Sequence, residues 1–103
     1  MENVTTTIKR EWLREIIAGR KTVENREIKP YWTKRLEGRE CPFLLRLING
    51  MAKVRPEVTV RIDRVEKNTA SNRYELHIGE VVNFENWDKQ REIPKPATEF
   101  IDL

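Results

Sequence analysis

The stretch KREWLREIIAGRKTVENREI, residues 9–28, decides the first half of the fold because its periodicity changes at a glycine. Its first part places apolar residues at helical spacings, at Trp12, Leu13, Ile16 and Ile17. Gly19 follows where the end of a helix favours a residue that can adopt positive φ. Residues 22–28 then predict a short strand, but its members between Val23 and Ile28 are polar or charged rather than apolar.

The rest of the chain predicts further strands. Residues 43–48 (FLLRLI) are almost continuously apolar, which is typical of a central strand covered on both faces. Apolar and polar residues alternate over 58–63 and again over 74–78, and Gly79 predicts a bulge before 81–84. The polar residues 67–73 predict a loop. A Thr-rich strand over 4–8, a short helical turn over 31–38 and a last strand over 100–103 complete the expected elements.

These elements predict an α+β fold, a small and mainly antiparallel β-barrel of five to six strands with one or two helices packed against it. The chain is too short for repeated βαβ units that cover both faces of a sheet. Its 103 residues, with no repeat or linker, predict one domain over residues 1–103. No apolar run approaches the ~20 residues of a membrane-spanning helix. A single cysteine excludes an intrachain disulfide and favours a reducing, cytoplasmic location.

Charge is distributed unevenly along the chain. Residues 9–73 hold 17 Lys or Arg against 9 Asp or Glu, whereas residues 74–103 hold 3 against 7. A basic body favours a polyanionic partner such as RNA, although a well-solvated surface would have the same composition. One histidine and one cysteine cannot form a zinc cluster of the usual kind. We therefore expect no metal and no other cofactor, although a purely carboxylate metal site stays open.

The charged side chains of the short strand point to a site. Residues two apart on a strand share a face, so Glu24 and Arg26 project together with Thr22. Lys21 lies at the junction of helix and strand, where its ammonium group can reach the same face. A cation, a carboxylate and a guanidinium are suited to bind a phosphate or a base edge, or to stabilise an oxyanion beside a general base. The alternative is a surface ion pair on an edge strand.

The motif Gly19-x-Lys21-x-x-Glu24-x-Arg26 resembles the G-x-K-x-x-E-x-R signature of the ASCH domains, relatives of the PUA-like RNA-binding barrels. The expected order of strand, amphipathic helix and motif is similar to the opening of that family. The resemblance implies a PUA-like barrel with a cleft beside the first helix, where RNA or a nucleoside binds. It also implies a function related to RNA, since some members of the family remove the acetyl group from N4-acetylcytidine and others cleave RNA.

The resemblance extends only in part to catalytic residues. Lys21 matches the lysine that the amidohydrolases use, whereas the position of their threonine nucleophile is occupied here by Glu24. Glu75 and Glu80 are candidates for their catalytic glutamate, which comes from a segment that does not align. If the protein is an enzyme, we expect Glu24 to act as general base or acid, with Lys21 and Arg26 stabilising negative charge.

Aromatic residues next to the motif offer a second binding element. Tyr31 and Trp32 lie among basic residues that include Lys29, and either ring could stack on an unpaired base. At least one ring of the pair is expected to point into the core.

Three hypotheses of function follow from these patterns. The first is an ASCH-type domain that binds RNA or a modified nucleoside in a cleft of Lys21, Glu24 and Arg26, with Thr22, Lys29, Tyr31 and Trp32 as further ligand contacts. The second is an enzyme built on that cleft, a metal-independent ribonuclease or nucleoside amidohydrolase. The third is a small protein-interaction module whose acidic C-terminal third docks a basic partner. The sequence does not predict the oligomeric state.

Overall fold

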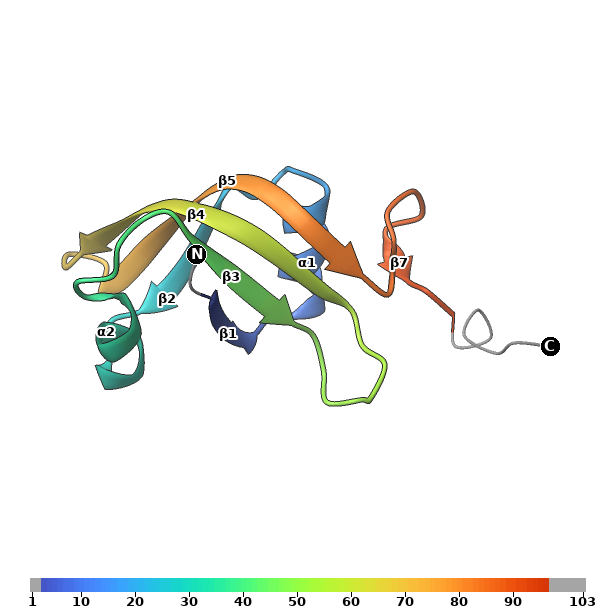
Figure 1. Ribbon diagram of the computed structural model, residues 1–103, viewed down its shortest axis with the longest axis horizontal. Helices are drawn as coiled ribbons and strands as arrows, with labels where there is room; N and C mark the ends of the chain where they lie inside the picture. Colours follow the sequence, from blue (N-terminus) through green and yellow to red (C-terminus); the bar gives the residue numbers. More distant parts are fainter. Residues whose placement is uncertain (1–2, 97–103) are drawn as a thin grey trace.

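The computed structural model describes residues 3–96, and Figure 1 shows how their elements are arranged. Helices and strands alternate in the first half of the chain and strands follow in the second. Their bounds are β1 (Asn3–Thr7), α1 (Arg10–Ile17), β2 (Val23–Glu27), α2 (Pro30–Leu36), β3 (Phe43–Ile48), β4 (Glu57–Asn68), β5 (Arg73–Glu85), β6 (Trp87–Asp88) and β7 (Ile93–Pro94). The strand expected over 100–103 lies outside the described residues.

Five strands form one curled sheet in the order β1-β3-β4-β5-β2. β1 runs parallel to β3, and the other three neighbouring pairs are antiparallel. The long strands β4 and β5 bend, so the sheet curves around the core as a half-barrel (Figure 1). The predicted α+β class and mainly antiparallel sheet are confirmed. The parallel pair is possible because α1, β2 and α2 together form the crossover that joins its two strands.

Helix α1 packs on β4 and β5 with the predicted apolar face, with one exception. Leu13, Ile16 and Ile17 are buried in the core. Trp12 was expected to share that face, but it is 45% exposed. It lies at the margin of the apolar stripe, on the open side of the half-barrel, where no strand within the described residues covers it. Gly19 has a φ of 81°, as the predicted helix end requires.

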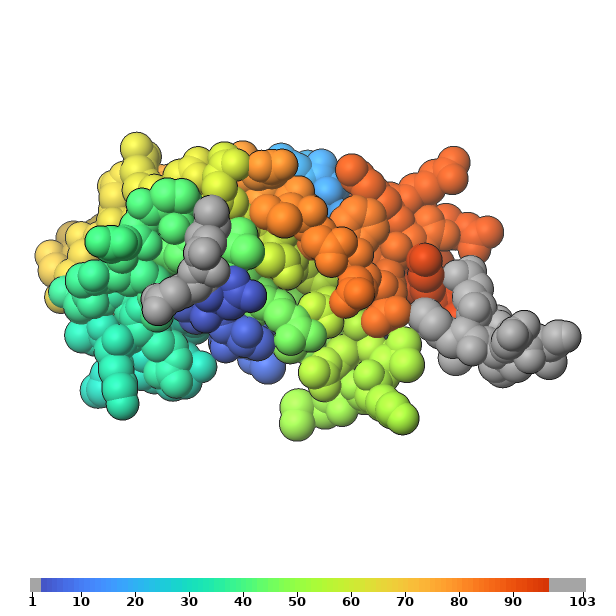
Figure 2. Space-filling model, viewed as in Figure 1, coloured from blue at the N-terminus to red at the C-terminus, as the bar shows by residue number. Residues whose placement is uncertain are grey.

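The hairpin of β4 and β5 is longer than its sequence suggests. Lys67 pairs with Tyr74 and Asn68 with Arg73, so the ladder continues through residues expected to form a loop. Backbone hydrogen bonds between β4 and β5 maintain the strand conformation here although the side chains are polar. Only residues 69–72 remain as the turn. The predicted bulge at Gly79 is confirmed, because the register passes from Ile78 directly to Glu80. A different connection, between β3 and β4, projects from the body of the molecule (Figures 1 and 2).

Candidate functional site

The two edge strands of the sheet, β1 and β2, are joined by side chains rather than by a ladder of hydrogen bonds. Arg26 on β2 donates from Nη2 to the carbonyl oxygen of Thr7 on β1, over 2.9 Å. We call this line of contact between the two edge strands the seam. The half-barrel therefore leaves an opening at the seam, and the charged side chains of β2 lie in it.

Glu24 is the central residue of the seam. It is the one charged residue classed as buried among residues 3–96, and its side chain is only 6% exposed. Its Oε2 accepts a hydrogen bond from Nε of Arg26 at 2.9 Å and forms an ion pair with Nη2 of the same side chain at 2.6 Å. Its Oε1 lies 3.4 Å from the ammonium of Lys21. A buried carboxylate is stabilised when both oxygens have cationic partners, so the predicted three-residue cluster is formed.

Lys21 is held in place by three contacts. Besides Glu24, its ammonium donates to the carbonyl oxygen of Val23 over 2.6 Å and lies 5.3 Å from the centre of the Trp12 ring. A cation over an indole face is attracted by the ring quadrupole. The turn after Gly19 thus brings Lys21 over the polar face of β2, as the sequence predicts.

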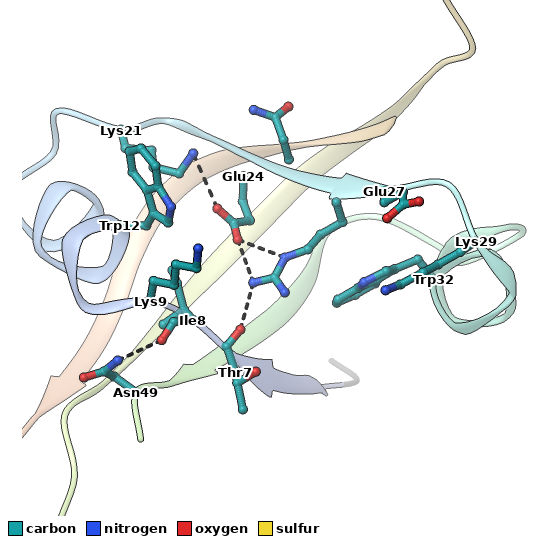
Figure 3. Close-up of a pocket in the computed structure, with 12 residues that line it drawn as sticks. Thr7, Ile8, Lys9, Trp12, Lys21, Glu24, Glu27, Lys29, Trp32 and Asn49 are labelled. Carbon is teal, nitrogen blue, oxygen red and sulfur yellow. Dashed lines mark hydrogen bonds and ion pairs between the residues drawn. The ribbon is translucent and has the colours of Figure 1, made fainter. Parts of the chain in front are cut away.

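Two tryptophans lie on opposite sides of Glu24 (Figure 3). Trp12 comes from α1 and Trp32 from α2. The Arg26 guanidinium lies 5.1 Å from the centre of the Trp32 ring, and Trp32 is 4% exposed, so it is mainly a core residue that also lines the opening. Of the two tryptophans, Trp12 has the exposed ring.

These residues line a cleft of about 700 Å³, which we call the seam cleft. Four cationic side chains and two carboxylates contribute to its lining, which leaves a net charge of +2: Lys9, Lys21, Arg26 and Lys29 against Glu24 and Glu27. Asn49 and Asn25 add amide groups. The cleft can thus offer an aromatic ring, hydrogen-bond donors and positive charge to one ligand, which are the groups that a nucleotide requires.

Other predicted site residues lie outside the seam cleft. Thr22 is exposed and does not line the cleft. It precedes the first residue of β2, so the alternation of side chains along a strand does not fix its direction. Tyr31 lines a separate groove. Glu75 and Glu80 lie on β5 and do not line the cleft either.

Sequence reasoning missed several residues that line the cleft, and among them Trp12 supplies an aromatic ring and Lys9 a positive charge. The missed residues are Thr7, Ile8, Lys9, Trp12, Asn25, Glu27 and Asn49. The signal for Trp12 was its place at the margin of the apolar stripe of α1. Lys9 is the N-cap residue of α1, adjacent in sequence to the seam strand β1. Neither position could be assigned to the cleft before the open side of the sheet was known.

Glu66, Glu75 and His77 form another cluster of potential metal ligands, with ligand atoms within 4.8 Å of one another. The His77 Nε2 lies 3.3 Å from Oε1 of Glu66. Two arginines contact the carboxylates: Arg64 lies 3.0 Å from Glu66 and Arg73 lies 3.7 Å from Glu75. These cations offset the charge of the two carboxylates without an added ion.

A further ion-pair cluster, which we call the outer cluster, consists of Arg61, Asp63 and Glu80. Arg61 contacts both carboxylates at 2.7 Å. The hydrogen bond from Arg61 holds the pKa of the Asp63 carboxyl below its ordinary value, and the attraction between the two charges adds to this effect. All three side chains are substantially exposed, so the cluster is a solvated surface network.

Comparison of the chain with protein-family models, with curated proteins and with solved structures gives no match. None of the helices within residues 3–96 is long and apolar enough to cross a membrane.

Proposed function

We propose that the protein is a PUA-like, ASCH-type domain that binds RNA or a nucleoside in the seam cleft. The observation that carries the proposal is the buried Lys21/Glu24/Arg26 cluster, placed between two tryptophans in a cleft of net positive charge. The order of β1, α1 and β2, with the cleft beside α1, agrees with the arrangement that the motif resemblance implies.

Each group has a clear role in such a site. The exposed Trp12 ring offers a stacking surface for an unpaired base. Lys21 has three N–H donors, and its contacts with Val23 and Glu24 occupy two of them, so one can meet a phosphate or a base acceptor. Glu24 keeps Lys21 and Arg26 in position, and Lys9 and Lys29 add charge at the cleft.

The pairing of Glu24 favours binding over general-base catalysis. A base must offer a carboxylate oxygen to the proton that it removes, whereas both oxygens of Glu24 face cations. Hydrolysis of RNA or of a modified nucleoside is therefore the second candidate, motivated by Lys21 and the family resemblance. It requires that a ligand first displace one of these contacts.

The alternative of an acidic docking face has less support. Three acidic residues of the C-terminal third are engaged by arginines: Glu80 by Arg61, Asp88 by Arg91 and Glu92 by Arg20. Their charge is thus partly neutralised within the molecule, which lowers its attraction for a basic partner.

A salt series of RNA binding tests the proposal. A fluorescent single-stranded RNA is titrated with the protein between 50 and 200 mM salt. We expect affinity to fall with salt, with a slope of about −0.7 in log–log form for each phosphate neutralised. Lys21→Ala should weaken binding and make the slope less steep by up to ~0.7 if Lys21 meets a phosphate. Lys89→Ala is the matched control, because Lys89 is exposed and outside the cleft.

The same samples separate binding from catalysis. Short RNAs and a panel of modified nucleosides that includes N4-acetylcytidine are incubated with the protein, with and without chelator, and products are measured by mass spectrometry. Products that persist with chelator and disappear in Lys21→Ala would establish the enzyme. Absence of RNA and nucleoside binding at low salt, or equal effects of Lys21→Ala and Lys89→Ala, would refute the proposed function.

A further inference from the structure

A second groove continues from the seam cleft along the edge strand β1. It has a volume of about 390 Å³, and its lining includes Thr5, Thr7, Tyr31, Met51 and Arg55. Thr7 also lines the seam cleft and accepts the hydrogen bond from Arg26. The two hollows therefore adjoin at Thr7, so a ligand longer than one nucleoside could occupy both. We call this second hollow the β1 groove.

Tyr31 gives the β1 groove an aromatic ring held in a fixed orientation. The ring is 42% exposed although it sits on α2 next to the buried Trp32. Its contact with Trp32 is edge-on, with ring centres 5.1 Å apart. The Arg35 guanidinium lies 3.5 Å from the ring centre and donates to the Tyr31 carbonyl oxygen over 2.8 Å. An exposed ring fixed in this way loses little entropy when a base stacks on it.

The groove also carries positive charge. Arg55 lies on the projecting β3–β4 connection, where it donates to the carbonyl oxygen of Ala52 over 3.4 Å. Arg35 does not line the groove, but its guanidinium lies against the Tyr31 ring. Threonines of β1 also line the groove, and their hydroxyls can donate to phosphate oxygens or accept from a ribose hydroxyl. The composition suits the backbone and one base of a nucleic-acid strand.

We infer that the β1 groove holds the nucleotide adjacent to the base in the seam cleft, so that the ligand is a single-stranded RNA segment rather than a free nucleoside. The inference rests on the proposed function of the seam cleft. Trp12 would stack on one base and Tyr31 on its neighbour, with the linking phosphate near Thr7. Each stacked base contributes ~1 to 3 kcal/mol to binding.

The test compares adenosine 5′-monophosphate with the trinucleotide ApApA, by calorimetry at constant salt. We expect the wild type to bind ApApA at least ~10-fold more tightly than the mononucleotide. Tyr31→Ala should reduce that ratio by at least ~5-fold, up to complete loss of the preference for ApApA, which corresponds to the removal of one stacked base. Arg55→Ala should reduce the ratio by a smaller factor. Arg64→Ala is the charge-matched control, since Arg64 is exposed and lies outside both hollows.

The outcomes distinguish this inference from the proposed function. Equal affinity for ApApA and the mononucleotide, or an unchanged ratio in Tyr31→Ala, overturns the inference and leaves the seam cleft as a nucleoside site. If neither ligand binds, the proposed function fails and the inference falls with it. Circular dichroism verifies that the variants are folded, as expected from the exposure of Tyr31.

Discussion

The seam cluster (Lys21, Glu24 and Arg26) and the outer cluster differ in surroundings although they share a sequence pattern. Each contains an acid and an arginine two residues apart on one strand, Glu24 and Arg26 on β2 and Arg61 and Asp63 on β4. In each, the arginine contacts its partner at under 3 Å. Local chemistry alone would assign the two pairs the same role.

The two clusters differ in solvent exposure, in net charge and in their aromatic neighbours. The Glu24 side chain is 6% exposed, whereas that of Asp63 is 45% exposed. The seam cluster has two cations for one carboxylate and borders two tryptophans, whereas the outer cluster has two carboxylates for one cation. Cation–π contacts join Lys21 and Arg26 to the two tryptophans, and within residues 3–96 Arg61 makes no such contact. The seam cluster and the outer cluster therefore carry net charges of opposite sign.

The backbone at Gly79 explains why the side chains of the outer cluster contact one another rather than border a cleft. A side chain at Gly79 would meet Asp63 Oδ2 at 2.0 Å, so the glycine in the bulge leaves space for that carboxylate. Asp63 and Arg61 then lie over the sheet and satisfy each other. Within residues 3–96 no strand lies between β1 and β2 to close the barrel at the seam, and the charged groups border a cleft instead. The comparison shows that an ion pair on a strand does not by itself indicate a functional site. The gap between β1 and β2 beside the Glu24–Arg26 pair is what distinguishes the candidate site.

The largest expected effect is on stability, from removing the central carboxylate. Glu24→Gln should lower the free energy of unfolding by roughly 2 to 4 kcal/mol, because it leaves Lys21 and Arg26 mostly buried without a counter-charge. Asp63→Asn, the matched change in the outer cluster, should leave the free energy nearly unchanged since its partners are solvated. Urea denaturation measures both. Equal losses of unfolding free energy would show that the burial of the seam cluster does not distinguish it energetically from the outer cluster.

The next effect is on binding. Trp12→Ala should weaken binding of single-stranded RNA by ~1 to 3 kcal/mol, because the stacking ring is lost. Stability should change little, given that the side chain is largely exposed. Val82→Ala removes a comparably exposed apolar side chain from β5, outside the cleft, and serves as control. Fluorescence anisotropy gives both affinities. A similar loss in the two variants would mean that Trp12 is not a specific contact.

A smaller effect on stability should follow from replacing the planar guanidinium of Arg26 at the seam. Arg26→Lys keeps the charge, but one ammonium cannot reproduce the paired contacts with Glu24 and Thr7. We expect a loss of about 1 to 2 kcal/mol in stability and faster amide hydrogen exchange in β1. The equivalent change Arg61→Lys should not affect exchange in β1. If exchange in β1 is unaltered by Arg26→Lys, the side chain does not hold the seam together.

The smallest effect concerns the pH dependence of the outer cluster. Because its pKa is lowered in the folded state, Asp63 stabilises the fold above its ordinary pKa of 3.8, and this contribution is lost as pH falls through the folded-state pKa. In Arg61→Gln, NMR titration should show the Asp63 pKa raised toward its ordinary value. An unchanged pKa would mean that Arg61 is not the cause of the shift, and the description of this cluster as a mutually satisfied pair would be wrong.

Much of the fold is predictable from local patterns. The apolar run 43–48 became β3 with the predicted bounds, and the end of α1 lies just before Gly19 as expected. The bulge at Gly79 and the grouping of Lys21 with Glu24 and Arg26 were also predicted correctly. These features follow from periodicity or from spacing along one strand, both of which act over a few residues.

The remaining features depended on contacts between distant segments. Trp12 is exposed because the sheet is open beside α1, and Tyr31 is separated from Trp32 because only one of two adjacent rings can face the core. Thr22 lies outside the cleft because it precedes β2, where the alternation of a strand does not fix the direction of its side chain. By itself the sequence determined the helices, most strands and the motif. Only the tertiary structure decided which charged strand borders a cleft, because the parallel pairing of β1 with β3 leaves β1 facing β2 across an unpaired seam.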